Sequence, residues 1–228
     1  NMEMTFQLTA EGVPQYALNY DGKKVILPSD LGFELRGVLK AQKLVYNADG
    51  TISKEDREPC NSFYDGFSVE SVETASFDDE WEPVWGEEAV IRNNYNELLV
   101  NLVQNSTERK MAVRFRLYDD GLGFRYEFPY QNNLSYFVIK EEMTEFALAG
   151  DHTAWWLPGD YDTQEYNFTE SRLSEIAENM QDAICGNDSQ TPFSANGVQT
   201  SLQMSTDDGL YSNSREAALV DYPCMPLE

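Results

Sequence analysis

The chain has 228 residues, of which 16 are basic and 40 acidic, so its formal net charge at pH 7 is −24. A surface of this sign repels the phosphates of nucleic acids and of anionic membranes, which excludes both as partners. The length suits one large all-β domain or two ordinary domains, and we favour a single domain over residues 1–228.

Alternation of apolar and polar residues dominates the first 150 residues and predicts β-strands. It is clear at Tyr16, Leu18 and Tyr20, which precede the turn pair Asp21-Gly22. The plainest case is residues 110–117, where an apolar residue occupies every second place. The turn Asp119-Asp120-Gly121 follows, and its composition predicts a hairpin with positive φ. Further strands are expected at residues 5–9, 24–27, 32–38, 67–74, 97–104, 123–128, 135–139 and 153–157.

One stretch of the C-terminal third has helical spacing. Its apolar residues fall at i, i+3, i+4 and i+7 from Leu173 to Met180, and Thr169 or Ser171 would serve as the N-cap. Polar residues 187–197 predict a loop, and residues 47–61 an exposed insertion without assigned function. Strands resume at residues 198–204, 209–213 and 217–220. The fold class is therefore all-β: a large antiparallel β-sandwich (super-sandwich) with at most one short helix.

No catalytic constellation is apparent in the sequence. The single histidine, His152, has no nucleophile signature around it, and the glycine patterns that hold phosphates are absent. Adjacent carboxylates point to opposite faces of a strand, and an Asp-Asp-Gly sequence is typical of a turn. We therefore predict no acid and base among the carboxylate pairs Glu87-Glu88, Asp119-Asp120, Glu141-Glu142 and Asp207-Asp208.

Aromatic residues are concentrated in residues 81–87 and 151–162. Tryptophan can stack on a sugar ring, although in a sandwich it more often packs in the core. Trp155 and Trp156 are neighbours, so only one of them can face inward from a strand. The other would cover a neighbouring element or a ligand, which makes both candidates for substrate binding.

Neither the cysteines nor the first residues of the chain indicate in which cellular compartment the protein is found. Cys60, Cys185 and Cys224 are an odd number without metal-binding spacing, so at most one disulfide is possible and buried free thiols are expected. No apolar run reaches the roughly 20 residues needed to span a bilayer, and the first residues lack the features of a signal peptide.

Six segments, in order and spacing, resemble the N-terminal domain of glycoside hydrolase family 97. They are residues 81–87 (WEPVWGE), 91–98 (IRNNYNEL), 119–128 (DDGLGFRYEF), 144–166 (TEFALAGDHTAWWLPGDYDTQEY), 189–193 (SQTPF) and 216–222 (EAALVDY). The resemblance implies an exported, periplasmic or cell-surface bacterial enzyme. Such an enzyme removes α-linked glucose, or in some members α-linked galactose, from the ends of oligosaccharides.

The resemblance also implies partners that this chain lacks. Family members continue into a (β/α)₈ barrel of about 250 residues that carries the catalytic carboxylates. We expect this chain to stop before that barrel and to be inactive alone. The surface that meets the barrel should be exposed and apolar, which would also allow a homodimer.

One functional residue follows from the resemblance. Glu216 matches the glutamate that reaches from this domain to a calcium ion at the active site of the barrel. Arg215 stands where the family pattern has histidine. The alternatives are that both are ordinary surface charges, or that the chain is a stand-alone carbohydrate-binding or adhesion sandwich.

Overall fold

The computed structural model describes residues 1–36, 42–56, 60–160, 165–184, 197–220, 222–223 and 226–227. Two predicted features lie largely or wholly outside these residues, namely the loop at 187–197 and the segment 189–193. The chain folds into two compact units, Asn1–Ala149 and Gly150–Glu228. The single domain over residues 1–228 stays a prediction.

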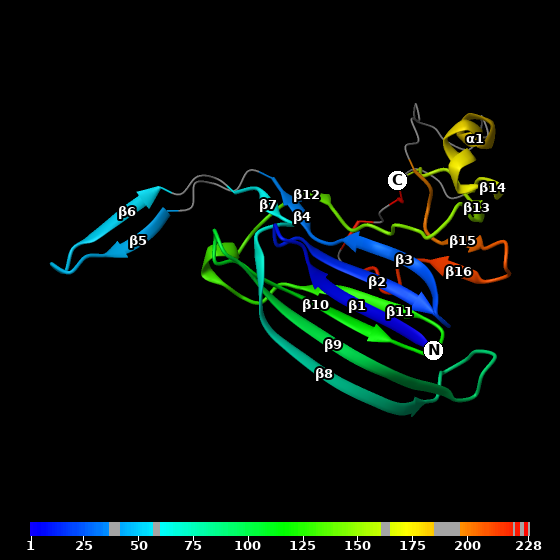
Figure 1. Cartoon of the computed structure of the whole chain (residues 1–228), viewed down its shortest axis with the longest axis horizontal. Coiled ribbons are helices and arrows are strands. Elements are labelled where there is room, and N and C mark those ends of the chain that lie inside the picture. Colours follow the sequence, from blue (N-terminus) through cyan, green and yellow to red (C-terminus); the bar gives the residue numbers. More distant parts are fainter. Residues whose placement is uncertain are drawn as a thin grey trace. The chain divides into compact units, whose positions relative to one another are not determined.

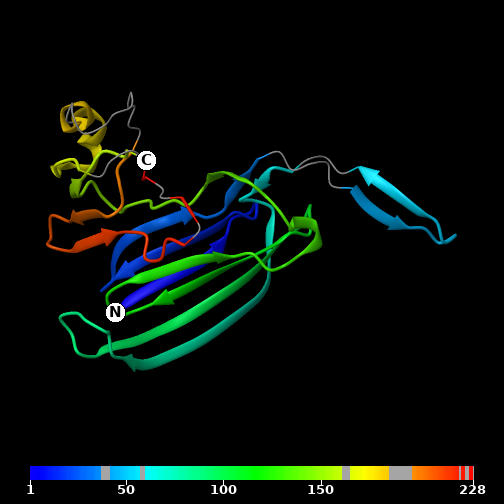
Figure 2. The ribbon, with the colours of Figure 1, turned by 180° about the vertical axis from the view of Figure 1, so that it is seen from behind.

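The first unit is built on two antiparallel sheets (Figure 1). One has the order β1-β2-β3 and the other the order β11-β10-β9-β8. The first contains β1 (Met2–Leu8), β2 (Pro14–Tyr20) and β3 (Lys23–Asp30). The second contains β8 (Phe67–Trp81), β9 (Ile91–Gln104), β10 (Lys110–Leu117) and β11 (Leu122–Glu127). Figure 2 shows the same two sheets from behind.

The core of this unit draws on both sheets, which confirms the predicted sandwich. Tyr16 of β2 is 1% exposed, and Met111, Val113 and Phe115 of β10 are buried with it. Met4, Phe6 and Leu8 of β1 pack against the same cluster. The alternation seen in the sequence therefore separates the core face of each strand from its outer face.

Short strands complete the unit. β4 (Phe33–Leu35), β7 (Ser62–Phe63) and β12 (Ile139–Glu142) form one small sheet, and a 3₁₀ turn, η1, covers Asn132–Leu134. The strand predicted at residues 135–139 is thus displaced toward the C-terminus. β5 (Gln42–Tyr46) and β6 (Ile52–Asp56) pair only with each other among the described residues. Most of the described side chains of residues 47–61 are exposed, as predicted, but the sequence did not predict this hairpin.

The two predicted Asp-Gly turns differ in conformation. At Asp21-Gly22 both residues have positive φ, 47° and 77°, as a two-residue hairpin prefers. The Asp119-Asp120-Gly121 hairpin closes with a hydrogen bond from Tyr118 N to Gly121 O at 2.8 Å, yet positive φ is absent from these described residues. The prediction of the turn is confirmed and the prediction of its backbone conformation is wrong.

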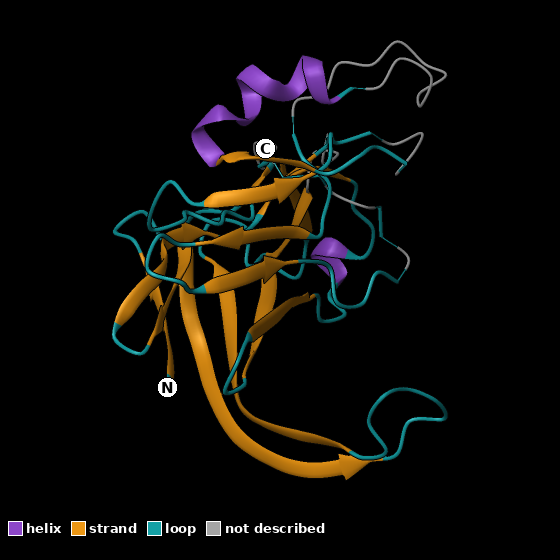
Figure 3. Cartoon of the chain, turned by 90° about the vertical axis from the view of Figure 1, so that its right-hand side faces the viewer, coloured by secondary structure: helices purple, strands orange, loops and turns teal. Residues whose placement is uncertain are grey.

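The second unit contains one four-stranded antiparallel sheet of order β14-β13-β15-β16. Its strands are β13 (Thr153–Trp156), β14 (Thr169–Arg172), β15 (Leu202–Ser205) and β16 (Tyr211–Ser214). A 3₁₀ turn, η2 (Leu173–Glu175), leads directly into α1 (Ile176–Ala183), drawn in purple in Figure 3. An all-β chain with one short α-helix is therefore confirmed.

The helix is where the spacing predicts it, but its N-terminus is held differently. Thr169 and Ser171 cannot be caps because they belong to β14, which pairs with β13 as far as Arg172. Asp151 caps the turn instead and accepts hydrogen bonds from Ser174 N and Ser174 Oγ, both at 2.9 Å. Glu175 accepts another from Arg172 N at 3.0 Å.

Among the described residues, none of the helices has the length and hydropathy needed to cross a bilayer.

Candidate functional site

Glu216 lies just beyond β16, in a segment without regular secondary structure. The strand predicted at residues 217–220 is absent from these described residues, and Leu219 and Val220 are 47% and 75% exposed. The prediction was wrong because an apolar run becomes a strand only where a neighbouring strand and a facing layer receive it. Glu216 is half-buried, and it makes no hydrogen bond or ion pair with the residues that the structure describes.

The surroundings of Glu216 test whether calcium fits there. Calcium takes six to eight oxygen ligands, and a carboxylate suits it. Within the described part of the chain, no group of three or more His, Cys, Asp and Glu side chains could hold a metal ion. Glu216 therefore fits as one ligand, and most of the remaining oxygens would have to come from elsewhere.

The two candidate tryptophans face opposite sides of β13. Trp156 is fully buried, and its Nε1 donates to Ser171 Oγ at 3.0 Å. Trp155 is half-buried, and its Nε1 donates to Glu170 Oε2 at 3.0 Å. Trp156 is thus a core residue and leaves Trp155 as the candidate with an accessible ring.

Within two of the predicted carboxylate pairs, three of the four side chains make local polar contacts. Asp207 is paired with Arg172, and Asp208 accepts a hydrogen bond from Thr206 Oγ1 within the turn. Glu141 is exposed, whereas Glu142 accepts a hydrogen bond from Thr144. His152 is half-buried, and its carbonyl accepts the hydrogen bond of Leu173 N that starts η2.

The structure gathers one carboxylate cluster that the sequence did not predict, on the outer face of the four-stranded sheet of the first unit. Arg114 bridges Glu97 and Glu127, and Arg116 binds Glu97 at 2.9 Å. The hydrogen bond from Arg114, helped by one from Arg125, lowers the pKa of Glu127 to about 2. A general acid needs a raised pKa, so this cluster stabilises the sheet rather than transferring protons.

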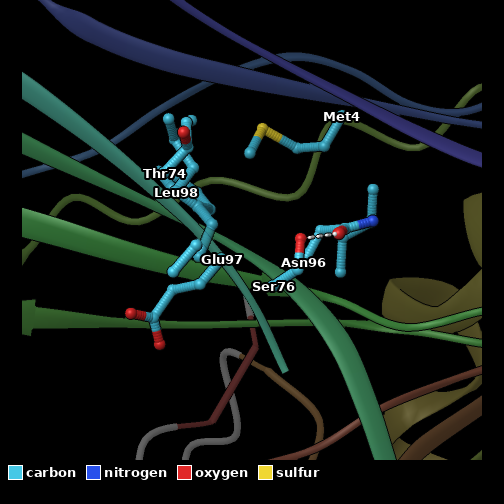
Figure 4. Close-up of a pocket in the computed structure, with 9 residues that line it drawn as sticks. Met4, Thr74, Ser76, Asn96, Glu97 and Leu98 are labelled. Atoms are coloured by element: carbon cyan, nitrogen blue, oxygen red, sulfur yellow. Dashed lines mark hydrogen bonds between the residues drawn. The ribbon is translucent and has the colours of Figure 1, made fainter. Parts of the chain in front are cut away.

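An open cleft of about 530 Å³ lies between β1 and the strands β8, β9 and β10. Figure 4 shows Met4 across the cleft from Ser76 and Asn96, with the carboxylate of Glu97 turned away. Ser76 Oγ donates to Asn96 Oδ1 at 2.7 Å. Among the described residues that line the cleft, Glu97 is the one titratable residue. Its carboxylate points away from the cleft and forms ion pairs with Arg114 and Arg116. The cleft has polar and apolar walls but no reactive group.

Comparison with known families decides what kind of domain this is. The chain matches the family described as "Glycosyl-hydrolase 97 N-terminal" over residues 1–228. It belongs to that family. The resemblance seen in the sequence to the N-terminal domain of glycoside hydrolase family 97 is therefore confirmed.

Solved structures of family 97 enzymes agree. Enzymes from Pseudoalteromonas sp. strain K8, in complex with panose and in complex with acarbose, each match 99% of this chain at 27% identity with a TM-score of 0.75. A β-arabinopyranosidase matches 90% at 17% identity with a TM-score of 0.60, which indicates a shared fold. This chain spans 28% of the length of each of these proteins.

Cysteine pairing is described only in part. Cys60 is a half-buried free thiol, as expected, whereas Cys185 and Cys224 lie outside the described residues.

Proposed function

We propose that this chain is the non-catalytic N-terminal domain of a calcium-dependent α-glycosidase that acts on the ends of oligosaccharides. A (β/α)₈ barrel elsewhere in the protein would carry the catalytic carboxylates, and this domain would support it. The observation that carries the proposal is the family match over residues 1–228. It is supported by four described carboxylates that arginines or a turn hold, which are therefore unsuited to acid and base chemistry: Glu97, Glu127, Asp207 and Asp208.

The proposed substrate is an α-linked oligosaccharide, with a glucoside preferred over a galactoside. Support comes from the related enzymes solved in complex with panose and with acarbose, at 27% identity to this chain. The same resemblance supports export to the periplasm or the cell surface of a bacterium.

The proposed contribution of this domain to the active site is Glu216. Its carboxylate is half-buried and unengaged within the described chain, so it is available to a cation. A bound calcium ion would supply positive charge beside the reacting sugar. The part played by this chain would be to supply one carboxylate from the segment that follows β16.

The test substitutes Glu216→Gln in the full-length enzyme. This change removes the charge with little change of shape, so we expect weaker calcium binding and lower activity on an α-glucoside. High calcium should restore part of the rate. Calcium titration by calorimetry and assays with and without a chelator measure both effects.

A matched control is Glu178→Gln, the same change at an exposed position of α1. It should leave calcium binding and activity unchanged, and both variants should unfold at the wild-type temperature. If Glu216→Gln keeps normal activity and normal sensitivity to the chelator, Glu216 is only a surface charge.

A further inference from the structure

The strands β8 and β9 continue as a two-stranded arm beyond the rest of their sheet. The last residue of β10, Leu117, pairs with Asn96, so residues 91–95 of β9 pair only with residues 77–81 of β8 within the described chain. Residues 82–90 connect the two strands at the end of the arm (Figure 3). A two-stranded ribbon is marginally stable in water unless another surface supports it.

The base of the arm has such support from its own domain. Phe77 stacks on Tyr95 with ring centroids 4.9 Å apart, and Tyr118 lies 5.3 Å from Tyr95. The guanidinium of Arg116 lies 4.5 Å from the centre of the Tyr95 ring. Tyr95 is consequently buried, and the base is fixed to the sheet.

The tip of the arm, residues 81–91, has no comparable support. Val84 is 101% exposed and Trp85 87% exposed. Trp81, Val90 and Ile91 are 51%, 47% and 37% exposed. None of the backbone groups of residues 82–90 makes a hydrogen bond to another described residue. Apart from the pairing of Trp81 with Ile91, the conformation of the tip is therefore not set by contacts among the described residues.

Five large apolar side chains within eleven residues are unusual on the surface of so acidic a chain. Single exposed apolar residues are common, but a cluster of them marks a contact surface. Tryptophan is also the residue type most enriched where protein surfaces bind one another. The tip includes the segment WEPVWGE, which none of the described contacts of this domain explains.

We propose that the tip of the β8–β9 arm is the surface on which this domain docks against the catalytic part of its own enzyme. This inference rests on the proposed function, because the partner is the part that would carry the barrel. Related enzymes are several times longer than this chain, which spans 28% of them, so the proposed partner would be large and joined to the domain covalently. Such a partner is present at high effective concentration.

The charges around the tip also favour this partner over a second copy of the domain. Residues 78–92 contain six carboxylates and one guanidinium, and Asp78 already binds that guanidinium, Arg92. Two such acidic tips would repel each other. An apolar patch with a rim of basic residues would instead bind one tip favourably. The docking surface on the catalytic part should have that character.

The test measures how accessible the tip is in the full-length enzyme. Val84→Cys and the control Tyr130→Cys each introduce one thiol at an exposed site of the first unit, where Tyr130 is 89% exposed. Both are labelled with a maleimide under native conditions, and the labelled peptides are followed by mass spectrometry separately from the native cysteines. We expect Val84→Cys to react at least several-fold more slowly than Tyr130→Cys. The difference should vanish in denaturant and be independent of enzyme concentration.

Three results would overturn the inference. These are equal labelling rates, protection that increases with enzyme concentration and so reveals a second copy, and protection that appears only when panose is added. If Val84→Cys does not fold, oxidative footprinting of Trp85 in the wild-type enzyme gives the same answer. Labelling needs no turnover. An enzyme that shows the protection but does not cleave an α-glucoside therefore contradicts the proposed function without contradicting the docking surface.

Discussion

At the scale of single residues, Trp155 and Trp156 show what a sequence pattern can decide. Alternation along a strand predicts that only one of them faces inward, and the structure agrees. Which one was not predictable, because it depends on the neighbours supplied by β14. There, Ser171 and Glu170 accept the hydrogen bonds of Trp156 and Trp155, respectively.

These opposite environments predict different energetic roles. Trp156→Ala would leave a large cavity and remove the hydrogen bond to Ser171 Oγ, so it should lower the free energy of unfolding by about 3–5 kcal/mol. Trp155→Ala, at a half-buried position, should lower the free energy of unfolding clearly less than Trp156→Ala does. Urea denaturation of the two variants measures the difference. Equal losses would mean that Trp156 is not the core residue of this sheet.

Glu216 is a residue that the sequence could single out only by resemblance. Neither its spacing nor its charge distinguishes it from the other acidic residues of the chain. A metal site is recognisable from local spacing when one segment supplies several ligands. Here Glu216 makes no hydrogen bond or ion pair within the described chain, and no group of three or more possible metal ligands is found there.

At the scale of elements, strands were predictable where one face is buried and the other exposed. β2 and β10 agree closely with the pattern because one face of each contributes to the core. β8 and β9 extend well beyond their predicted ends, to Trp81 and from Ile91. Most of these outer residues are exposed, whichever face of the ribbon they lie on. The sequence there therefore lacks the alternation of apolar and polar residues that would predict a strand.

The connection between the two main sheets of the first unit gives a prediction for one glycine. Gly66 N donates to Glu11 O at 2.9 Å and Phe67 N donates to Gly12 O at 3.0 Å, which joins the β1–β2 turn to the start of β8. Gly12 has φ of 75°, and a Cβ there would lie 2.6 Å from the backbone N and O of Phe67. The close approach therefore requires glycine.

Gly12→Ala should accordingly be strongly destabilising. The matched control is Gly22→Ala, which has a similar positive φ, 77°, but no neighbouring atom within 4 Å of the added Cβ. The control should cost about 1–2 kcal/mol for backbone strain alone, and Gly12→Ala should cost more by the steric clash. Thermal unfolding of both variants tests this. Similar melting temperatures of the two variants would show that the β1–β2 turn and β8 can move apart without loss of stability.

At the scale of the whole molecule, composition predicted that nucleic acid and anionic membranes are poor partners, and the six motifs indicated the family. Neither could indicate how exposed each candidate contact is. The exposed tip of the β8–β9 arm and the unengaged Glu216 emerge only from the fold, because exposure is a property of packing. Both features are unexplained by the described contacts of this chain, and the proposed larger enzyme would account for them.

The most direct test of the account is an activity assay of this chain beside the full-length enzyme. p-Nitrophenyl α-glucoside is the substrate, calcium is present, and both proteins are purified to the same standard. We predict turnover by the full-length enzyme and none by residues 1–228, since the described carboxylates offer no acid and base pair. Turnover by this chain that disappears when one of its own carboxylates is replaced by an amide would contradict the account.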